Sequence, residues 1–306
     1  MTSTNYADVK DFLHDDELIR LLCADRTYAQ LCDAFLGDDF LVVDRSMKVP
    51  FFAEVRDYVG ATERADPRGH WIVKPIAGED ALASAMGAIC FFLDFFTHTI
   101  SAPTVITRID GALYKATRVI THAEQLTGAN YTDIAQLKEQ LVLDLINRWI
   151  YCDEDRNPNN YMIRYTSRND QVIIAIDFSN VDLLHPGTKI TGHAKSFGWE
   201  RSEKTRYLTP LKVEHFLAYD MRFFDMRFDG FRSVSRKMLM DLCKACLRFH
   251  PGKTKIAKTV ADNIMQRIDY VFEYFSGKFP REAGAEKEDK YSAMGETFTR
   301  IYKEKR

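Results

Sequence analysis

Apolar residues recur at helical spacing in several long segments of this chain. Intervals of three and four residues predict helices over about 7–36, 79–98 and 132–150. The part from about 211 to 305 is predicted to be mostly helical and to end in a charged tail. The helix over 79–98 is long and apolar.

Other segments carry the β-branched and aromatic residues that favour strands. The runs "FLVVDRS" and "HWIVK" each predict one strand, and "TVITRIDGALYKATRVI" predicts two strands around an Asp110–Gly111 turn. The segment "YMIRYTSRNDQVIIAIDFSNV" predicts a further hairpin, closed at Ser167–Asp170. Strands thus dominate the earlier part of the chain and helices the remainder.

This division predicts an α+β protein with two lobes. We expect a small β-rich lobe followed by a larger helical lobe. The expected boundaries are a helical extension over 1–45, the N-lobe over 46–122, the C-lobe over 123–280 and a charged tail over 281–306.

Composition restricts the possible classes of protein. In 306 residues, 46% are hydrophobic and 12% aromatic, which supports a packed core and argues against global disorder. The net charge of −2 gives no reason to expect a nucleic-acid partner. The first residues lack a signal-peptide pattern, and the longest apolar stretch is short and interrupted by Asp94, so no transmembrane segment is expected. A cytoplasmic protein with reduced thiols follows as the expectation, and Cys243 and Cys246 are predicted to be core residues.

One short loop has a composition that a plain turn does not require. Residues 153–160, "DEDRNPNN", combine three acids, one Arg, three Asn and one Pro. Asp155 and Asn160 are five positions apart, and Asp177 follows the apolar run "VIIAI". A hairpin between them would return Asp177 to the end where Asn160 lies. Carboxylate and amide oxygens are suitable ligands for Mg²⁺, so phosphoryl transfer is the chemistry that this pattern favours.

A candidate phosphate-binding cation lies upstream of this loop. Lys74 ends the strand "HWIVK", after a loop punctuated by Gly60 and Gly69 that could cover phosphates. The predicted elements follow one another in the order of a kinase fold: strand, loop, strand with Lys, helix, two strands, helix, D-x-x-x-x-N, hairpin and Asp.

The stretch "DRNPNN" followed by "VIIAIDFSNV" resembles the HipA-like kinases, particularly the small bacterial HipA-like kinase domain, and is similar to type II phosphatidylinositol 4-kinases. The resemblance covers roughly residues 50–275 and implies a two-lobed protein-kinase-like fold that uses ATP and Mg²⁺. It implies that Asp155 orients an acceptor hydroxyl and that Asn160 and Asp177 bind the metal. It also implies that Lys74 contacts the α- and β-phosphates. Ile120 to His122 would offer backbone groups to adenine, and Arg156 would supply a further positive charge.

The sequence departs from ordinary protein kinases at several positions. Asp153 and Glu154 replace the usual His-Arg, Asn157 replaces the usual Lys, and no acid lies in the middle of the helix after Lys74. A protein Ser or Thr is the favoured acceptor. A lipid acceptor of the phosphoinositide type, AMP transfer, and a pseudokinase or nucleotide-binding interaction module are the alternatives.

Simpler structural interpretations exist for each residue. Asp155 and Asn160 could be turn residues, Asp177 a helix N-cap, and Lys74 a surface residue at a strand end. Asp153 and Glu154 are expected to be solvated acids.

Overall fold

The computed structural model describes the following parts of the chain, to which all structural statements below refer. They are residues 40–42, 71–97, 99, 101–102, 104–109, 112–118, 123–126, 135–153, 158–165, 171–186, 219–247 and 249–281.

The strands form two separate sheets. The four-stranded sheet has the order β1-β2-β4-β3, in which β1 runs parallel to β2 and the other neighbours are antiparallel. The three-stranded sheet has the antiparallel order β5-β6-β7. The strands are β1 (Phe40–Val42), β2 (Trp71–Pro75), β3 (Thr104–Ile109), β4 (Ala112–Arg118), β5 (Ala123–Gln125), β6 (Tyr161–Tyr165) and β7 (Gln171–Ala175).

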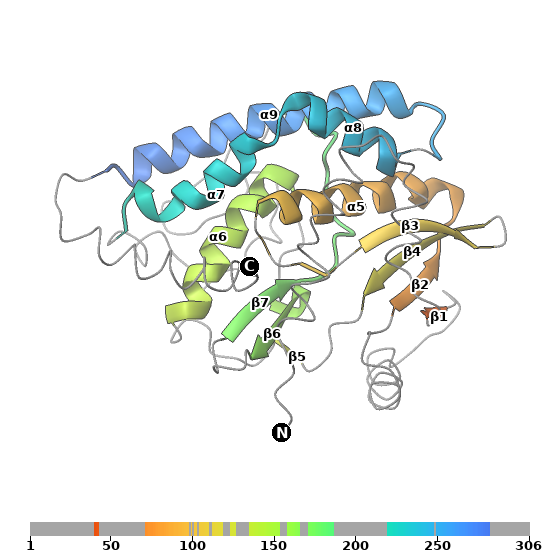
Figure 1. Cartoon of the computed structure of the whole chain (residues 1–306), viewed down its shortest axis with the longest axis horizontal. Helices are drawn as coiled ribbons and strands as arrows, with labels where there is room; N and C mark the ends of the chain where they lie inside the picture. Colours follow the sequence, from red (N-terminus) through yellow and green to blue (C-terminus); the bar gives the residue numbers. More distant parts are fainter. Residues whose placement is uncertain are drawn as a thin grey trace, which may run out of the picture.

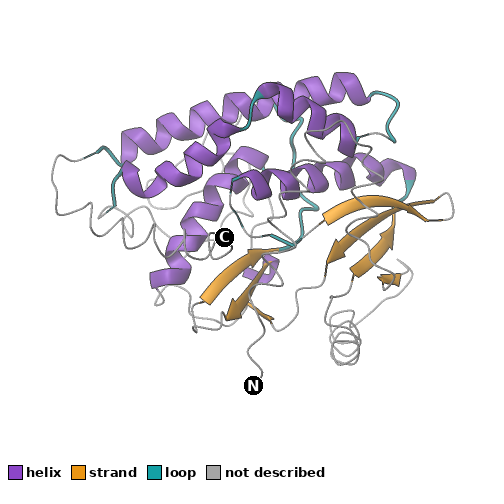
Figure 2. Ribbon diagram, in the orientation of Figure 1, coloured by secondary structure: helices purple, strands orange, loops and turns teal. Residues whose placement is uncertain are grey.

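Helices lie on one side of both sheets (Figures 1 and 2). In Figure 1 the sheets lie at the bottom, α5 and α6 are in the middle, and α7, α8 and α9 form the upper layer. The helices are α5 (Ala81–Phe96), α6 (Ala135–Tyr151), α7 (Met221–Ser233), α8 (Arg236–Cys246) and α9 (Lys253–Lys278), with 3-10 turns η1 (Gly78–Asp80) and η2 (Pro158–Asn160).

Helix α5 lies in the interior of the molecule. Every residue from Ala85 to Asp94 is buried, as its nearly continuous apolar sequence predicts. The longer α9 instead buries one face, on which successive buried residues are spaced three or four positions apart: Val260, Ile264, Ile268, Val271 and Phe275. Side chains of Asp220 and Ser235 cap the N-termini of α7 and α8 by accepting hydrogen bonds from backbone N–H groups.

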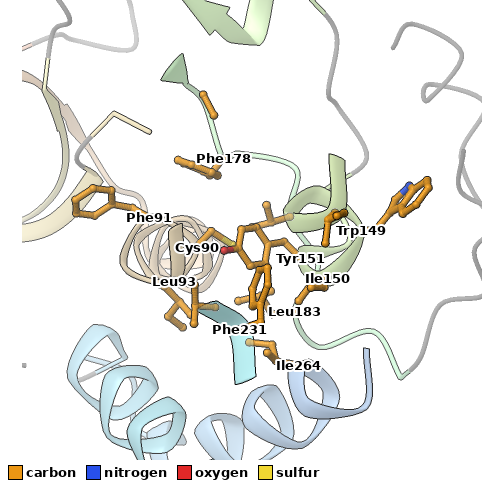
Figure 3. Packing of buried hydrophobic residues seen from close by; sticks show 14 of the residues in the cluster. Cys90, Phe91, Leu93, Trp149, Ile150, Tyr151, Phe178, Leu183, Phe231 and Ile264 are labelled. Carbon is orange, nitrogen blue, oxygen red and sulfur yellow. The ribbon is translucent and has the colours of Figure 1, made fainter. Parts of the chain in front are cut away.

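Aromatic side chains fill much of the space between the helices. Phe224 and Phe228 on α7 pack against Phe275 on α9, which also contacts Trp149 on α6. Figure 3 shows Tyr151 between Cys90 of α5 and Phe231 of α7. Burying such large side chains removes much apolar area from water and is the main contribution to the stability of this layer.

The structure confirms the α+β class and the strands and helices expected within the described ranges. Ile109 lies opposite Ala112, so the expected β3–β4 hairpin is present, although its Asp110–Gly111 turn lies outside the described residues. Strand β5 was not expected from the sequence. Cys243 and Cys246 are buried core residues as predicted, and burial raises the pKa of the Cys243 thiol. No helix in the described ranges is long and apolar enough to cross a membrane.

Several expectations concern residues outside the described ranges. These are the helices over 7–36, the Ser167–Asp170 turn and the tail beyond Arg281. The boundaries between the four expected segments remain predictions.

Candidate functional site

The β6–β7 hairpin brings Asn160 and Asp177 to the same end of the three-stranded sheet. Tyr161 lies opposite Ala175 in the antiparallel register. The backbone N–H of Ile176, immediately before Asp177, donates a 2.9 Å hydrogen bond to the carbonyl oxygen of Asn160. The hairpin predicted from the sequence is therefore present, and its backbone hydrogen bond joins Asn160 to the residue that precedes Asp177.

Asp177 adopts a backbone conformation that is uncommon for a residue other than glycine. Its φ angle is 56°, in the left-handed region, where Asp and Asn are the better-tolerated residues. The Asp177 Oδ1 atom accepts a 3.1 Å hydrogen bond from the backbone N–H of Ser179, an Asx-type turn. Residues 178–186 form turns and a bridge, so the N-cap interpretation of Asp177 is wrong. The Asp177 side chain is 50% exposed and can reach a ligand.

Two lysines stand opposite each other in the four-stranded sheet. Lys74 of β2 pairs with Lys115 of β4, and residues directly opposite in an antiparallel pair project from the same face. Lys115 Nζ lies 4.0 Å from Asp177 Oδ1, so this contact links the four-stranded sheet to the segment that follows β7. Burial lowers the pKa of Lys115, the carboxylate of Asp177 opposes this effect, and the charge of Lys74 lowers the pKa further.

Phe178 anchors the chain directly after Asp177. Its side chain is 1% exposed, and its ring lies under the Arg148 guanidinium, 4.9 Å from ring centroid to Cζ. Gly87 of α5 meets Phe178 on another side, where a Cβ added to Gly87 would lie 3.2 Å from Phe178 Cβ and 3.3 Å from its carbonyl oxygen. The absence of a side chain at Gly87 therefore allows α5 to approach this segment closely.

Arg148 lies at the centre of a buried group of charged and polar side chains. Its Nη2 atom donates to Asp94 Oδ2 at 2.6 Å and to Asp144 Oδ1 at 3.0 Å, and its Nη1 atom lies 3.9 Å from Asp153 Oδ2. Burial alone would lower the pKa of Arg148, yet Asp144 and Asp94 raise it well above its ordinary value. Tyr151 and Tyr161 complete the group by donating to Asp94 and Asp144.

The network around Arg148 accounts for the positions of two acids, Asp153 and Asp94. Asp153 is fully buried beside Arg148, so its interpretation as a solvated acid is wrong. Asp94 is the single acid in the sequence of α5, and its carboxylate contacts Arg148, Asn147 and Tyr151. The carboxylate of Asp94 is therefore bound inside the buried network.

The chain is anchored on both sides of residues 154–157. Before them, Asp153 forms an antiparallel bridge with Val181, and the N–H of Asp182 donates to the carbonyl of Cys152 at 3.2 Å. After them, η2 leads to Asn160 and the hairpin. From α9, Arg267 donates to the carbonyl oxygens of Ile150, Asp182 and His185, while Asn263 donates to that of Leu183.

Three of the residues singled out from the sequence are described by the structure. Asn160 and Asp177 are joined at the hairpin end, and Lys74 lies beside Lys115, which contacts Asp177. The remaining six lie outside the described residues: Asp155, Arg156, Gly60, Gly69, Ile120 and His122. Their proposed roles stay predictions.

Lys115 is the site residue that the sequence did not reveal. In the sequence, Lys115 is only one residue of the predicted strand "ALYKATR". The β2–β4 register, which pairs strands separated by a helix and another strand, shows that Lys115 lies opposite Lys74.

The oxygen atoms at the hairpin end suit a hard cation. A carboxylate offers about four acceptor positions, so Asp177 retains capacity beyond its bond from Ser179. Within the described ranges, no group of three or more His, Cys, Asp and Glu side chains forms a metal cluster. Mg²⁺ does not need one, because it is commonly held by one or two carboxylates together with substrate phosphates and water.

Comparison with known proteins gives no family assignment. No family model matches this sequence, and no curated protein matches it significantly.

Proposed function

We propose that this protein is an ATP- and Mg²⁺-dependent phosphotransferase of the HipA-like type. It transfers the γ-phosphoryl group to a hydroxyl, and a protein Ser or Thr is the favoured acceptor. The observation that carries the proposal is the pairing of Lys74 with Lys115, whose Nζ lies 4.0 Å from Asp177 Oδ1, together with the backbone hydrogen bond from the residue before Asp177 to Asn160. Cations beside a hard-oxygen site suit a metal–polyphosphate complex.

The order of elements supports a kinase-like arrangement of two lobes. Strand β2 with Lys74 is followed by α5, and β3 and β4 then return to the same sheet in the order β2-β4-β3. Strand β5, α6 and the β6–β7 hairpin follow and lead to Asp177. This succession agrees with the kinase order proposed from the sequence.

The proposed roles follow from charge and position. Lys74 binds nucleotide phosphates, while Asn160 and Asp177 hold Mg²⁺, which would neutralise charge on the phosphate oxygens. Asp155 orients the acceptor and accepts its proton as the acceptor oxygen bonds to the γ-phosphorus. The bond from that phosphorus to the β–γ bridging oxygen breaks, and ADP leaves.

A second candidate function is a pseudokinase that binds nucleotide without turnover. The observation favouring it is the commitment of Asp94, the single acid of α5, to Arg148 in the interior. This helix therefore supplies no carboxylate to Lys74, in contrast to the Glu that pairs with the corresponding Lys in ordinary protein kinases.

The test measures turnover and binding separately. Label transfer and phosphate release from γ-labelled ATP with Mg²⁺ are compared for wild type, Asp155→Asn and Asp177→Asn. Asp241→Asn, a carboxylate change on the outer face of α8, is the matched control. Loss of turnover in both site variants, with the control active, is expected.

The alternatives predict other patterns. Binding of ATP without turnover by wild type would favour the pseudokinase. Transfer of α-label would indicate AMP transfer, and label appearing in added phosphatidylinositol vesicles would indicate a lipid acceptor. Absence of ATP binding by wild type would refute the nucleotide site altogether.

A further inference from the structure

Lys74 and Lys115 form an arrangement that is unfavourable by itself. Like charges directly opposite on one face of an antiparallel pair repel each other. The third residue of this row is Ile106 of β3, which lies opposite Lys115 and is buried. Lys115 is thus a largely buried cation, 21% exposed, between an apolar side chain and a second cation. A side chain that only filled this position would need no charge.

The ammonium of Lys115 faces Asp177, one of the two residues that are proposed to hold the metal. Its Nζ lies 4.0 Å from Asp177 Oδ1, on the side of the carboxylate facing the four-stranded sheet. Phe178 packs between Gly87 and Arg148 and fixes the chain next to Asp177. These buried contacts hold Asp177 at its distance from Lys115. The position that Lys115 occupies is therefore next to the position that a metal–phosphate complex would occupy.

We propose that Lys115 is a second phosphate-binding cation of this site and that it serves as the counter-ion of Asp177 until nucleotide binds. This inference rests on the proposed nucleotide site. Two lysines side by side would contact different oxygens of one polyphosphate, and the polyphosphate would relieve their mutual repulsion. The same change would release Asp177 from Lys115, making its carboxylate available as nucleotide and metal arrive together.

This arrangement predicts effects of opposite sign for the two partners. Lys115→Met removes a phosphate contact, and ATP binding should weaken about ten-fold or more, the effect of one charge-assisted hydrogen bond. Asp177→Asn removes the carboxylate that competes with phosphate for Lys115 and that repels the phosphate. ATP binding without metal should therefore tighten by about two- to five-fold, as expected for a partly exposed ion pair. In the double variant the gain from Asp177→Asn should shrink, because Lys115 is no longer there to be released.

The experiment is a calorimetric titration of the full chain with ATP and ADP, once with EDTA and once with Mg²⁺. The panel contains wild type, the two single variants, the double variant and Lys115→Arg, which keeps the charge and should bind within about three-fold of wild type. Lys244→Met, on α8 away from the sheets, is the matched loss of a lysine and should bind as wild type does. Opposite signs for the two single variants distinguish this role from a general loss of folding, which would weaken binding in both.

Two results would overturn the inference in distinguishable ways. If wild type binds ATP and Lys115→Met binds it equally well, Lys115 is not a phosphate ligand, although the nucleotide site stands. If wild type binds neither ATP nor ADP under either condition, the proposed function and the role of Lys115 fail together.

Discussion

The contact between Gly87 and Phe178 offers a way to disturb the candidate site through the helix α5 that packs against it. Gly87→Ala adds one methyl group on α5, at a residue that is not itself proposed to touch nucleotide. That Cβ would lie 3.2 Å from Phe178 Cβ and 3.3 Å from the Phe178 carbonyl oxygen. Since Phe178 follows Asp177, displacing its backbone would move Asp177 as well.

Two effects of known size compete in this substitution. Replacing Gly by Ala inside a helix stabilises by about 1 kcal/mol. Overpacking a filled interior costs about 1–3 kcal/mol. Phe178 is held under Arg148 and is 1% exposed, so it cannot yield without breaking that contact. We therefore expect the free energy of unfolding to fall by about 1 kcal/mol, because the overpacking exceeds the helix gain.

Gly277→Ala is the matched control. Gly277 lies near the end of α9, and a Cβ added there would meet nothing within 4 Å. It should raise the free energy of unfolding by about 0.5–1 kcal/mol. Urea denaturation would compare the two variants, and ATP titration with Mg²⁺ should show weaker binding for Gly87→Ala alone. If Gly87→Ala stabilises the protein as Gly277→Ala does and binds ATP normally, the proposed role of this contact in positioning Asp177 is wrong.

Three further predictions concern the core and a helix cap. Arg148→Met should lower the free energy of unfolding by about 3–5 kcal/mol in urea titrations, because three buried aspartates lose their cation. The control Arg236→Met, at an exposed ion pair, should lower it by at most about 1 kcal/mol, and equal losses would contradict this reasoning. Ser235→Ala removes the cap of α8 and should cost about 1 kcal/mol in the same assay, whereas an unchanged midpoint would show that the cap contributes nothing. Burial raises the pKa of Cys243, so peptide mapping after iodoacetamide treatment should find Cys243 and Cys246 labelled only in urea; rapid labelling of the native protein would refute their burial.

Local patterns were sufficient to predict most of the described elements. The apolar run of α5, the β-branched and aromatic residues of "HWIVK" and the β6–β7 hairpin each depend on residues close together in sequence, and each is found where it was expected. The joining of Asn160 and Asp177 follows from the same hairpin. Strand β5 is only three residues long, and its pairing with β6 depends on a partner beyond α6, so its own sequence carried little signal.

The features that were missed depend on contacts between distant segments. Lys115 gained its significance from the pairing of β2 with β4 and from its contact with Asp177, two residues beyond the end of β7. Asp153 looked like a solvated acid because charged loop residues usually are exposed, and only Arg148 on α6 explains its burial. A sequence read element by element identifies which residues carry charge, but it does not show which opposite charge will face them.

The buried network under the site is better explained by what it positions than by what it adds to stability. Transferring charged groups such as Asp94, Asp144 and Arg148 from water is costly, and well-packed apolar residues of similar volume are often at least as stable. Arg148, however, contacts the two chain segments that frame the site. Its guanidinium stacks on Phe178, directly after Asp177, and it faces Asp153, directly before residues 154–157. An apolar side chain could fill the same volume, but it could not set one rigid, planar cation against both segments.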